Sequence, residues 1–441
     1  MRPDVIFALA SGAGRAAVAV MRLSGRGTAE VVAALAGGSP PAPRLATLRR
    51  LRHPGGGEVL DRALVLWFPG PRSYTGEDAA ELHLHGGPAV VAGVAEALVA
   101  AGARPAEPGE FTRRAFLHGK LDLTAAEGIA DLVAAETAAQ RRQALRQAEG
   151  ALAALYGGWT VKLTGLLARQ EAFIEFEDED LPAGLDDAVG AAAAALRTEI
   201  EAHLADGGRG ERLRDGLLVA IVGAPNAGKS SLLNALVGRE AAIVSARAGT
   251  TRDVVEARLD LGGVPVTLAD TAGLRDAVAD EIEAEGVRRA RARAGEADLL
   301  LAVFAADSPP DAGTLALVRP DGVLVVANKT DLAQAPERIG GVEAIGVSVR
   351  TGEGLAALRG RLVEEATARA GLAAEARLTR PRHRAALREA ADWLAELGGA
   401  GLPELRAEAL RAALRAIGRI TGRVGVEAVL DSVFAEFCIG K

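Results

Sequence analysis

Residues 223–230 have the types and the spacing of a phosphate-binding loop. The run Gly-Ala-Pro-Asn-Ala-Gly-Lys-Ser follows the apolar stretch 217–222 and precedes the helix-forming stretch 231–237, the strand, loop and helix order that such a loop requires. Its glycines allow backbone N–H groups to surround phosphate oxygens at a helix N-terminus. Lys229 is expected to reach the β- and γ-phosphates, and the Ser230 hydroxyl to bind Mg²⁺.

Two further motifs follow in the order of a nucleotide-dependent switch. Asp-Thr-Ala-Gly at 270–273 comes after the strand-like stretch 264–269, which directs the Asp270 carboxylate toward Mg²⁺ and the Gly273 N–H toward the γ-phosphate. Between this motif and the loop, Thr251 is expected to complete the magnesium shell when GTP is bound. The pattern predicts a nucleoside-triphosphate hydrolase.

The base is indicated by Asn-Lys-Thr-Asp at 328–331, after the apolar stretch 323–327. The Asp331 carboxylate can accept from both N1–H and the exocyclic amine of guanine, a donor pair that adenine lacks. Lys329 is expected to lay its stem along the base plane. The loop 347–350 reads Val-Ser-Val-Arg where GTPases usually carry Ser-Ala-Lys or Ser-Ala-Arg; the expected contact is a backbone N–H, so the valine is tolerated. These residues predict GTP rather than ATP.

The residue that activates water is less evident. Ras-like enzymes use a glutamine directly after the sensor glycine, and Leu274 occupies that position here. The acidic stretch 280–285 lies just downstream and offers a carboxylate for the role. A solvated helix start is the alternative interpretation of such a charge run.

The regions around the nucleotide motifs have different compositions. Residues 1–118 mix short β-like runs, at 63–68 and 80–84, with a helical stretch at 89–101, which indicates a small α/β domain. Long helical patterns rich in Ala, Leu, Glu and Arg then occur on both sides of the GTPase motifs. They cover 124–150, 158–176 and 187–205 before the motifs, and 382–397, 402–417 and 422–437 after them.

Two helical blocks that flank a self-contained domain indicate one bundle interrupted by an insertion. We therefore predict a multidomain α/β plus all-α protein. Its domains are an N-terminal α/β domain at 1–118, a helical domain at 119–211 and 373–441, and an inserted Ras-like P-loop GTPase domain at 212–372.

Composition restricts the class of protein. The 441 residues are 49% hydrophobic and 25% charged, with a net charge of −7, so there is no global attraction for nucleic acid. The single cysteine, Cys438, excludes an internal disulfide. No apolar run reaches the roughly 20 residues of a membrane span, and the N-terminal run 5–10 is too short for a secretory signal. We expect a cytoplasmic protein without a membrane partner.

The motifs resemble one family over the whole chain: the bacterial and organellar tRNA modification GTPases MnmE, also called TrmE. The resemblance rests on MRLSG at 21–25, YTGED at 74–78, HGGP at 85–88, PGEF at 108–111, KLDL at 120–123, PNAGKSS at 225–231, GREAAIV at 238–244 and FCIGK at 437–441. The last of these is very specific.

The resemblance implies a one-carbon chemistry outside the GTPase domain. Family members form homodimers through the N-terminal domain and bind formyl- or methylene-tetrahydrofolate there. The matching positions are Arg22, Glu81, Lys120 and Lys441. With the flavoprotein MnmG, in a heterotetramer, such proteins form the carboxymethylaminomethyl or aminomethyl group on the wobble uridine of certain tRNAs.

The resemblance also implies potassium-stimulated hydrolysis in paired GTPase domains. The family's potassium ligand matches Asn226, with Ser245, Arg247 and Thr250 in the loop that supplies further oxygens. Glu283 takes the water-positioning role, and Glu281 remains an alternative because one extra residue follows Gly273. The full predicted GTP-binding set is Asn226, Ala227, Gly228, Lys229, Ser230, Ser231, Ser245, Thr250, Thr251, Asp270, Thr271, Ala272, Gly273, Asn328, Lys329, Asp331, Ser348 and Val349.

Some alternatives stay open. Cys438 is a candidate nucleophile or a small buried hydrophobe. The cluster Arg380, Arg382, His383 and Arg384 is a candidate for tRNA phosphates or an ordinary solvated surface. The competing functions are a GTP-driven switch or ribosome-assembly GTPase without covalent chemistry, and a folate enzyme in which GTP is only regulatory.

Overall fold

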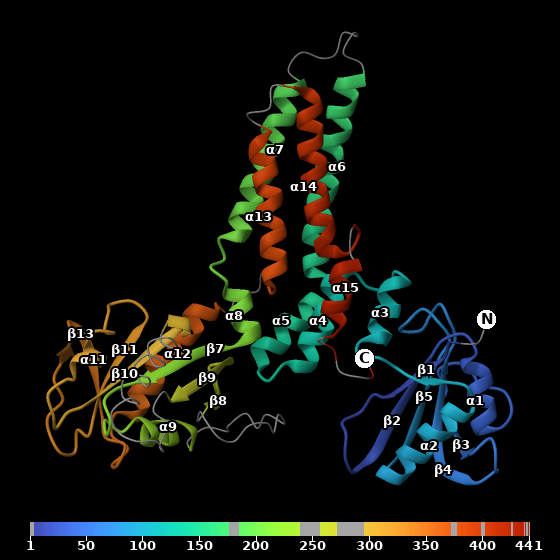
Figure 1. Ribbon diagram of the computed structural model, residues 1–441, viewed down its shortest axis with the longest axis horizontal. Coiled ribbons are helices and arrows are strands. Elements are labelled where there is room, and N and C mark those ends of the chain that lie inside the picture. Colours follow the sequence, from blue (N-terminus) through green and yellow to red (C-terminus); the bar gives the residue numbers. More distant parts are fainter. Residues whose placement is uncertain are drawn as a thin grey trace, which may run out of the picture. The chain divides into compact units, whose positions relative to one another are not determined.

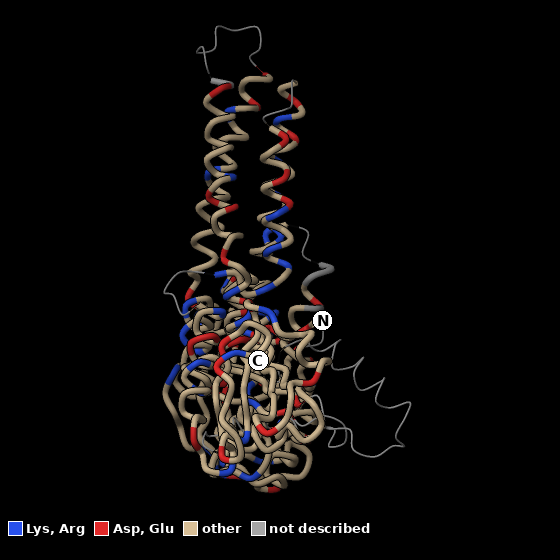
Figure 2. Tube along the Cα trace, turned by 90° about the vertical axis from the view of Figure 1, so that its left-hand side faces the viewer, with Lys and Arg blue, Asp and Glu red and all other residues tan. Residues whose placement is uncertain are grey.

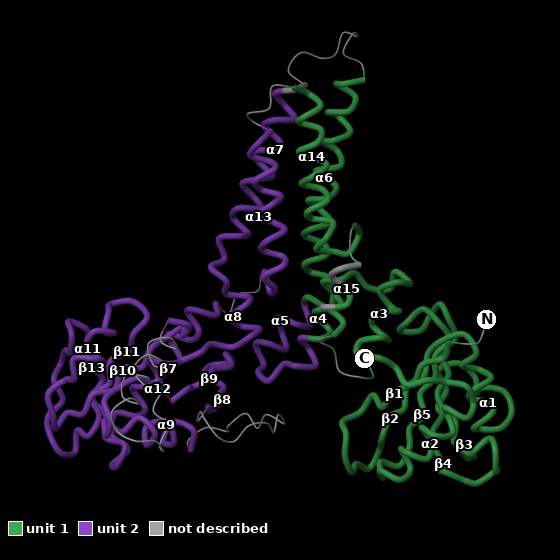
Figure 3. Tube along the Cα trace, in the orientation of Figure 1, with its two compact units in different colours: residues 1–130, 147–186, 400–441 green, residues 131–146, 187–399 purple. Residues whose placement is uncertain are grey.

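The computed structural model describes residues 4–175, 185–238, 256–270, 295–371, 377–397, 402–424, 427–435, 437 and 440. The chain forms two compact units, each assembled from separate segments (Figure 3). Unit 1 contains Met1–Ala130, Gln147–Asp186 and Ala400–Lys441, and unit 2 contains Asp131–Arg146 and Asp187–Gly399.

Unit 1 begins with a six-stranded sheet in the order β3-β4-β5-β2-β1-β6 (Figure 1). The strands are β1 (Ile6–Leu9), β2 (Ala16–Ser24), β3 (Thr47–Arg52), β4 (Val59–Phe68), β5 (Ala79–Gly86) and β6 (Arg104–Pro105). Neighbours pair antiparallel except β1 and β6. Alternate side chains such as Val65, Trp67 and Leu82 are buried, as the period of two in a one-sided sheet requires. They pack against α1 (Thr28–Ala36) and α2 (Pro88–Ala100).

The rest of unit 1 is helical. It contains α3 (Glu110–Leu117), most of α4 (Leu123–Ala134), α6 (Ala151–Glu175), α14 (Pro403–Thr421) and α15 (Glu427–Ala435). The helices α6 and α14 pack along each other, as Figure 1 shows. Among the described residues, α6 alone has the length and apolar composition of a membrane span; one side of it, including Trp159 and Leu163, is buried. Figure 2 shows acidic and basic residues interspersed along the described helices.

Unit 2 is built on a seven-stranded sheet in the order β12-β13-β11-β10-β7-β9-β8. The strands are β7 (Leu217–Val222), β8 (Glu256–Leu261), β9 (Val264–Asp270), β10 (Leu299–Ala305), β11 (Val323–Asn328), β12 (Arg338–Ile339) and β13 (Val342–Val347). The five central strands are parallel, and the two edge strands are antiparallel. Continuous apolar runs such as 299–304 form β10 because its residues are buried on both faces.

Helices cover this sheet and extend from it. They are α9 (Lys229–Val237), α11 (Ala312–Leu315), α12 (Leu355–Ala370), α8 (Arg209–Asp215), α5 (Ala138–Ala148), α7 (Leu185–Leu204) and α13 (Pro381–Glu396). The predicted fold class, an α/β and all-α multidomain protein with a P-loop GTPase fold, is confirmed. The helical pattern predicted over 124–150 corresponds to two helices, because the chain is non-helical at 135–137, where Glu136 and Thr137 bond to Gln140.

The helical residues are divided between the two compact units. Residues 131–146 belong with the GTPase strands, and Ala139 of α5 is part of the GTPase core. The predicted domain boundaries, at 118, 211 and 372, remain a prediction.

Candidate functional site

The phosphate-binding loop connects β7 to α9. Asn226 has a φ of 66° and Gly228 a φ of 93°, so two left-handed residues turn the chain before the helix begins. A Cβ on Gly228 would lie 2.2 Å from Asn328 Nδ2. The loop thus needs glycine at this point for space as well as for backbone conformation.

Lys229 lies inside this loop. Its side chain is buried, and Nζ donates to the carbonyl oxygens of Gly223 and Ala224 at 2.8 and 2.9 Å. Burial lowers the pKa of Lys229, while the carboxylates of Asp270 and Asp311 act to raise it. A phosphate group that entered the loop would therefore meet a pre-placed ammonium.

Ser230 and Asp270 meet at the carboxyl ends of β7 and β9. These strands are parallel neighbours, with Ile221 opposite Asp270, and Ser230 Oγ donates to Asp270 Oδ2 at 2.6 Å. Asp270 is only 2% exposed. A hydroxyl and a carboxylate are hard oxygen ligands of the kind that Mg²⁺ prefers, so this pair fits the predicted ion.

The base motif is attached to the loop through Asn328. Its side chain is buried, and Nδ2 donates to the Ala227 carbonyl at 2.9 Å. The Val349 N–H donates to Asn328 Oδ1 at 3.4 Å. One amide therefore holds the phosphate and base subsites in register.

Asp331 is oriented by the loop after β13. Ser348 Oγ donates to its Oδ1 at 2.7 Å, and Arg350 Nε lies 2.7 Å from Oδ2. The hydrogen bond from Ser348 is the main reason that the pKa of Asp331 is lowered, and Arg350 adds to it. The carboxylate is thus ionised and positioned as an acceptor for guanine.

Asp307 and Arg350 were not assigned a role from the sequence. Asp307 Oδ2 pairs with Lys329 Nζ at 3.2 Å, and Arg350 pairs with Asp331. Asp307 follows β10 outside any motif, and the contact joins residues far apart in sequence, so no local pattern could have indicated it. The left-handed φ of 68° at Lys329 marks the same loop.

Three of the four predicted folate positions are described. Arg22 and Glu81 are cross-strand partners on β2 and β5, with Nη2 and Oε1 at 3.0 Å. They line a cavity of about 240 Å³ together with Tyr74 and Phe111. Lys120 Nζ donates to the Pro71 carbonyl at 3.0 Å. It thereby contacts the loop between β4 and β5 that forms one wall of the cavity.

Ser231 lies in the first turn of α9, directly after Ser230. The remaining predicted site residues lie outside the described part of the chain. They are Ser245, Arg247, Thr250, Thr251, Thr271, Ala272, Gly273, Glu281, Glu283, Cys438 and Lys441.

The cluster at 380–384, a candidate for tRNA phosphates or for a solvated surface, requires correction. Arg380 is 6% exposed and pairs with Asp131 at 2.9 Å, and His383 is fully buried. Arg384 pairs with Asp206 at 2.7 Å and also with Glu211. Arg380, His383 and Arg384 therefore join elements of unit 2 rather than forming a basic surface, because the guanidinium groups of Arg380 and Arg384 are already neutralised within the fold.

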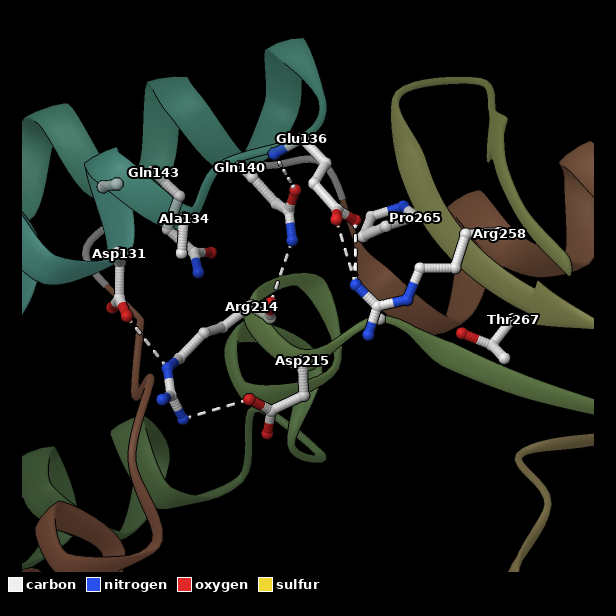
Figure 4. A pocket seen from close by; sticks show the side chains of 12 residues that line it. Asp131, Ala134, Glu136, Gln140, Gln143, Arg214, Asp215, Arg258, Pro265 and Thr267 are labelled. Carbon is white, nitrogen blue, oxygen red and sulfur yellow. Dashed lines mark hydrogen bonds and ion pairs between the residues drawn. The ribbon is translucent and has the colours of Figure 1, made fainter. Parts of the chain in front are cut away.

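A second cavity, of about 250 Å³, lies within unit 2 between α5 and the strands β8 and β9. Figure 4 shows Arg258 of β8 reaching Glu136 before α5, and Arg214 reaching Asp131. Gln140 Nε2 donates to the Arg214 carbonyl at 2.9 Å. Ion pairs therefore fasten residues 131–146 to the GTPase strands.

Comparisons with known proteins decide the family. A model of the MnmE helical domain matches residues 123–438, and one described as GTP-binding protein TrmE N-terminus matches residues 5–120. The tRNA modification GTPase MnmE of Gluconacetobacter diazotrophicus is 61% identical, over 99% of this chain and 98% of that protein. This chain belongs to the MnmE family. The MnmE proteins of Rhodospirillum rubrum and Paramagnetospirillum magneticum are 57% and 56% identical, over 100% and 99% of this chain and 100% of each relative.

Membership of the MnmE family confirms the predicted class of enzyme, a GTP hydrolase. Among solved structures, the G domain of the T. maritima FeoB iron transporter is 29% identical. The match covers 34% of this chain and 98% of the FeoB chain, with a TM-score of 0.27.

Proposed function

We propose that this protein is a potassium-stimulated GTPase that acts with the flavoprotein MnmG on tRNA. The complex forms the carboxymethylaminomethyl or aminomethyl group of the wobble uridine, with a one-carbon tetrahydrofolate as carbon donor. The names of the full-length relatives, tRNA modification GTPases, support the tRNA substrate, and we propose a cytoplasmic place of action. The observation that carries the proposal is a GTP site in unit 2 accompanied by the Arg22–Glu81 cavity in unit 1.

The folate assignment is supported by the chemistry of this cavity. A pterin presents an N–H and an exocyclic amine side by side, a donor pair that one carboxylate can accept. Glu81 is held in place by Arg22, whose Nη2 and Nε both donate to Oε1 at 3.0 and 3.2 Å, while its Oε2 lies 3.2 Å from His83 Nε2 and has a further lone pair for a ligand donor. The adjacent rings of Tyr74 and Phe111 offer surfaces for a planar head group.

The GTPase assignments extend the geometry of unit 2. Ser230 and Asp270, with Thr251, would hold Mg²⁺, which offsets charge on the phosphates. Asn226 is exposed at the outer side of the loop, where its carbonyl oxygen can be offered to K⁺ together with oxygens of Ser245, Arg247 and Thr250. Glu283 orients the attacking water, since Leu274 cannot.

A homodimer is supported by the open face of the N-terminal sheet. Leu48 and Leu64 are directly opposed on β3 and β4, yet 62% and 41% exposed. Arg22 and Glu81 project from this same face, because they alternate with buried neighbours on their strands. A second copy on this face would bury the apolar pair.

The test is a Glu283→Ala variant of the full chain. We expect GTP binding to be retained, hydrolysis to fall about 100-fold or more, and wobble-uridine modification to be lost with it. Glu281→Ala tests the alternative residue: it should hydrolyse normally, and a loss of hydrolysis in this variant instead would assign the water-positioning role to Glu281. Modification that persisted without hydrolysis would favour a folate enzyme in which GTP is regulatory. Normal wobble uridine in tRNA from cells lacking the protein would favour a GTP-driven switch.

A further inference from the structure

The cavity in unit 1 has two distinct ends. At its inner end, Phe111 is fully buried and Tyr74 Oη is within 2.9 Å of Thr112 Oγ1. The Arg22–Glu81 pair lies on its wall. At the outer end, the lining residues Arg44 and Arg72 are both exposed.

The outer arginines differ from the other arginines around this site. Arg22 pairs with Glu81, Arg104 with Glu110, and Arg114 with Glu77 and Glu110. In the described part of the chain, no carboxylate lies within ion-pair distance of Arg44 or Arg72. The cavity lining therefore has more positive than negative charge, and the excess is at the mouth.

Arg44 is held in place without an acidic partner. Its guanidinium lies over the Phe68 ring, 5.6 Å from the centroid, and donates to the Arg72 carbonyl. Lys120 donates to the neighbouring Pro71 carbonyl at 3.0 Å. Two cationic side chains thus fix the loop that carries Arg72 and add to the positive charge there.

The cavity is large enough to enclose only one part of a folate. About 240 Å³ is below the roughly 300–1,000 Å³ of sites that enclose a drug-sized ligand. It suits a bicyclic head group, while the remainder must leave past the mouth. Arginine is the side chain that best matches carboxylates, through paired N–H donors.

We propose that Arg44 and Arg72 bind the carboxylates of an oligo-γ-glutamyl tail, so that the site selects polyglutamylated over monoglutamylated folate. This rests on the proposed folate function and deepens it. Additional glutamates reach beyond the cavity and meet the guanidinium groups of Arg44 and Arg72, which have no carboxylate partner in the described part of the chain.

The test compares the dissociation constants of 5-formyltetrahydrofolate carrying one and three glutamates, for the full-length protein. We expect the triglutamate to bind about fivefold more tightly, as two exposed charge pairs would give. Arg72→Gln should reduce the ratio, Arg44→Gln with Arg72→Gln should bring it to about one, and Arg72→Glu should lower it further. Because Arg44 has a φ of 63°, glutamine there meets the same backbone cost as arginine.

The matched control is Arg52→Gln. Arg52 is exposed at the far end of β3, about 17 Å along the strand from Thr47 at a rise of about 3.3 Å per residue. Within the described residues, its side chain bonds to the Gly57 carbonyl and to no carboxylate. It should keep the wild-type ratio. Equal binding of both forms to the wild type, or an unchanged ratio in the double variant, would overturn the tail site alone. Absence of binding by either form would overturn the folate function with it.

Discussion

At the scale of single residues, the GTP site depends on side chains that bind other parts of the site rather than only a ligand. Asn328 bonds to the loop carbonyl of Ala227, and Ser348 bonds to Asp331. The second contact keeps the carboxylate ionised and oriented before guanine arrives. Specificity therefore depends on residues that do not themselves meet the base edge.

Gly228→Ala tests the contact between the phosphate and base subsites. A left-handed φ costs an L-residue about 1–2 kcal/mol. The added Cβ would also lie only 2.2 Å from Asn328 Nδ2 and would displace that amide. We expect GTP affinity to fall more than about tenfold, as measured by titration with a fluorescent GTP analogue. Gly295→Ala is the control, because a Cβ there meets no atom within 4 Å, and it should bind normally.

At the scale of elements, charged residues far apart in sequence connect the helices to the GTPase strands. Asp131, near the end of α4, accepts from Arg214 at the end of α8 and from Arg380 before α13. Arg258 of β8 reaches Glu136 in the same way. In unit 1, Asp4 and Glu77 accept from Arg114 of α3. These pairs position elements whose local sequences only specify that they are helices or strands.

Asp131→Asn tests this connection in unit 2. Asparagine at this position removes the carboxylate charge that faces the buried Arg380 guanidinium. Breaking such a buried ion pair lowers the free energy of unfolding by about 3 kcal/mol. We expect thermal unfolding of unit 2 to occur about 5 °C or more lower, followed by the fluorescence of Trp393 in α13. Asp392→Asn, at an exposed position of the same helix, should unfold like the wild type.

Acid stability tests the Glu110 cluster in unit 1. Burial alone would raise the pKa of Glu110, but hydrogen bonds from Arg104, the Glu107 amide and Arg114 lower it to about 2, from 4.5. A carboxyl group with a lowered folded-state pKa stabilises fully above its unfolded-state value. Its contribution is therefore lost as pH falls from about 4.5 to 2.

We expect Glu110→Gln to reduce the dependence of unit 1 stability on pH within that interval. The measurement is the thermal midpoint at a series of pH values, followed by the fluorescence of Trp67. A slope equal to that of the wild type would show that the cluster does not contribute.

At the scale of the whole molecule, the two candidate chemistries lie in different compact units. The GTP site belongs to unit 2 and the candidate folate cavity to unit 1. Hydrolysis and carbon transfer therefore use separate atoms. Under the proposed function, GTP hydrolysis and carbon transfer are linked because the complex changes conformation with the nucleotide state of the GTPase domain.

The dependence of hydrolysis on K⁺ tests the paired-GTPase proposal. Replacing Na⁺ by K⁺ should raise the hydrolysis rate at least about tenfold, because a cation at the phosphates offsets developing charge. The rate per chain should also rise with protein concentration in K⁺ alone. Asn226→Ala should remove both effects while GTP still binds, and an unchanged response to K⁺ would exclude Asn226 as the ligand.

The sequence by itself determined the local parts of this protein. The glycines and apolar runs predicted β7, the loop and α9, and Asn-Lys-Thr-Asp indicated the base site, because each needs only residues adjacent in the chain. The alternation at 80–84 likewise predicted β5. The family resemblance rested on short motifs for the same reason.

Only the tertiary structure decided which charges face each other. It buried Arg380 and His383, which composition alone left as a candidate basic surface, and it placed Ala139 in the GTPase core. It also left Arg44 and Arg72 without carboxylate partners among the described residues. Ion pairs and burial join residues up to 249 positions apart, as Arg380 and Asp131 are, and hydrophobic periodicity contains no information on such pairing.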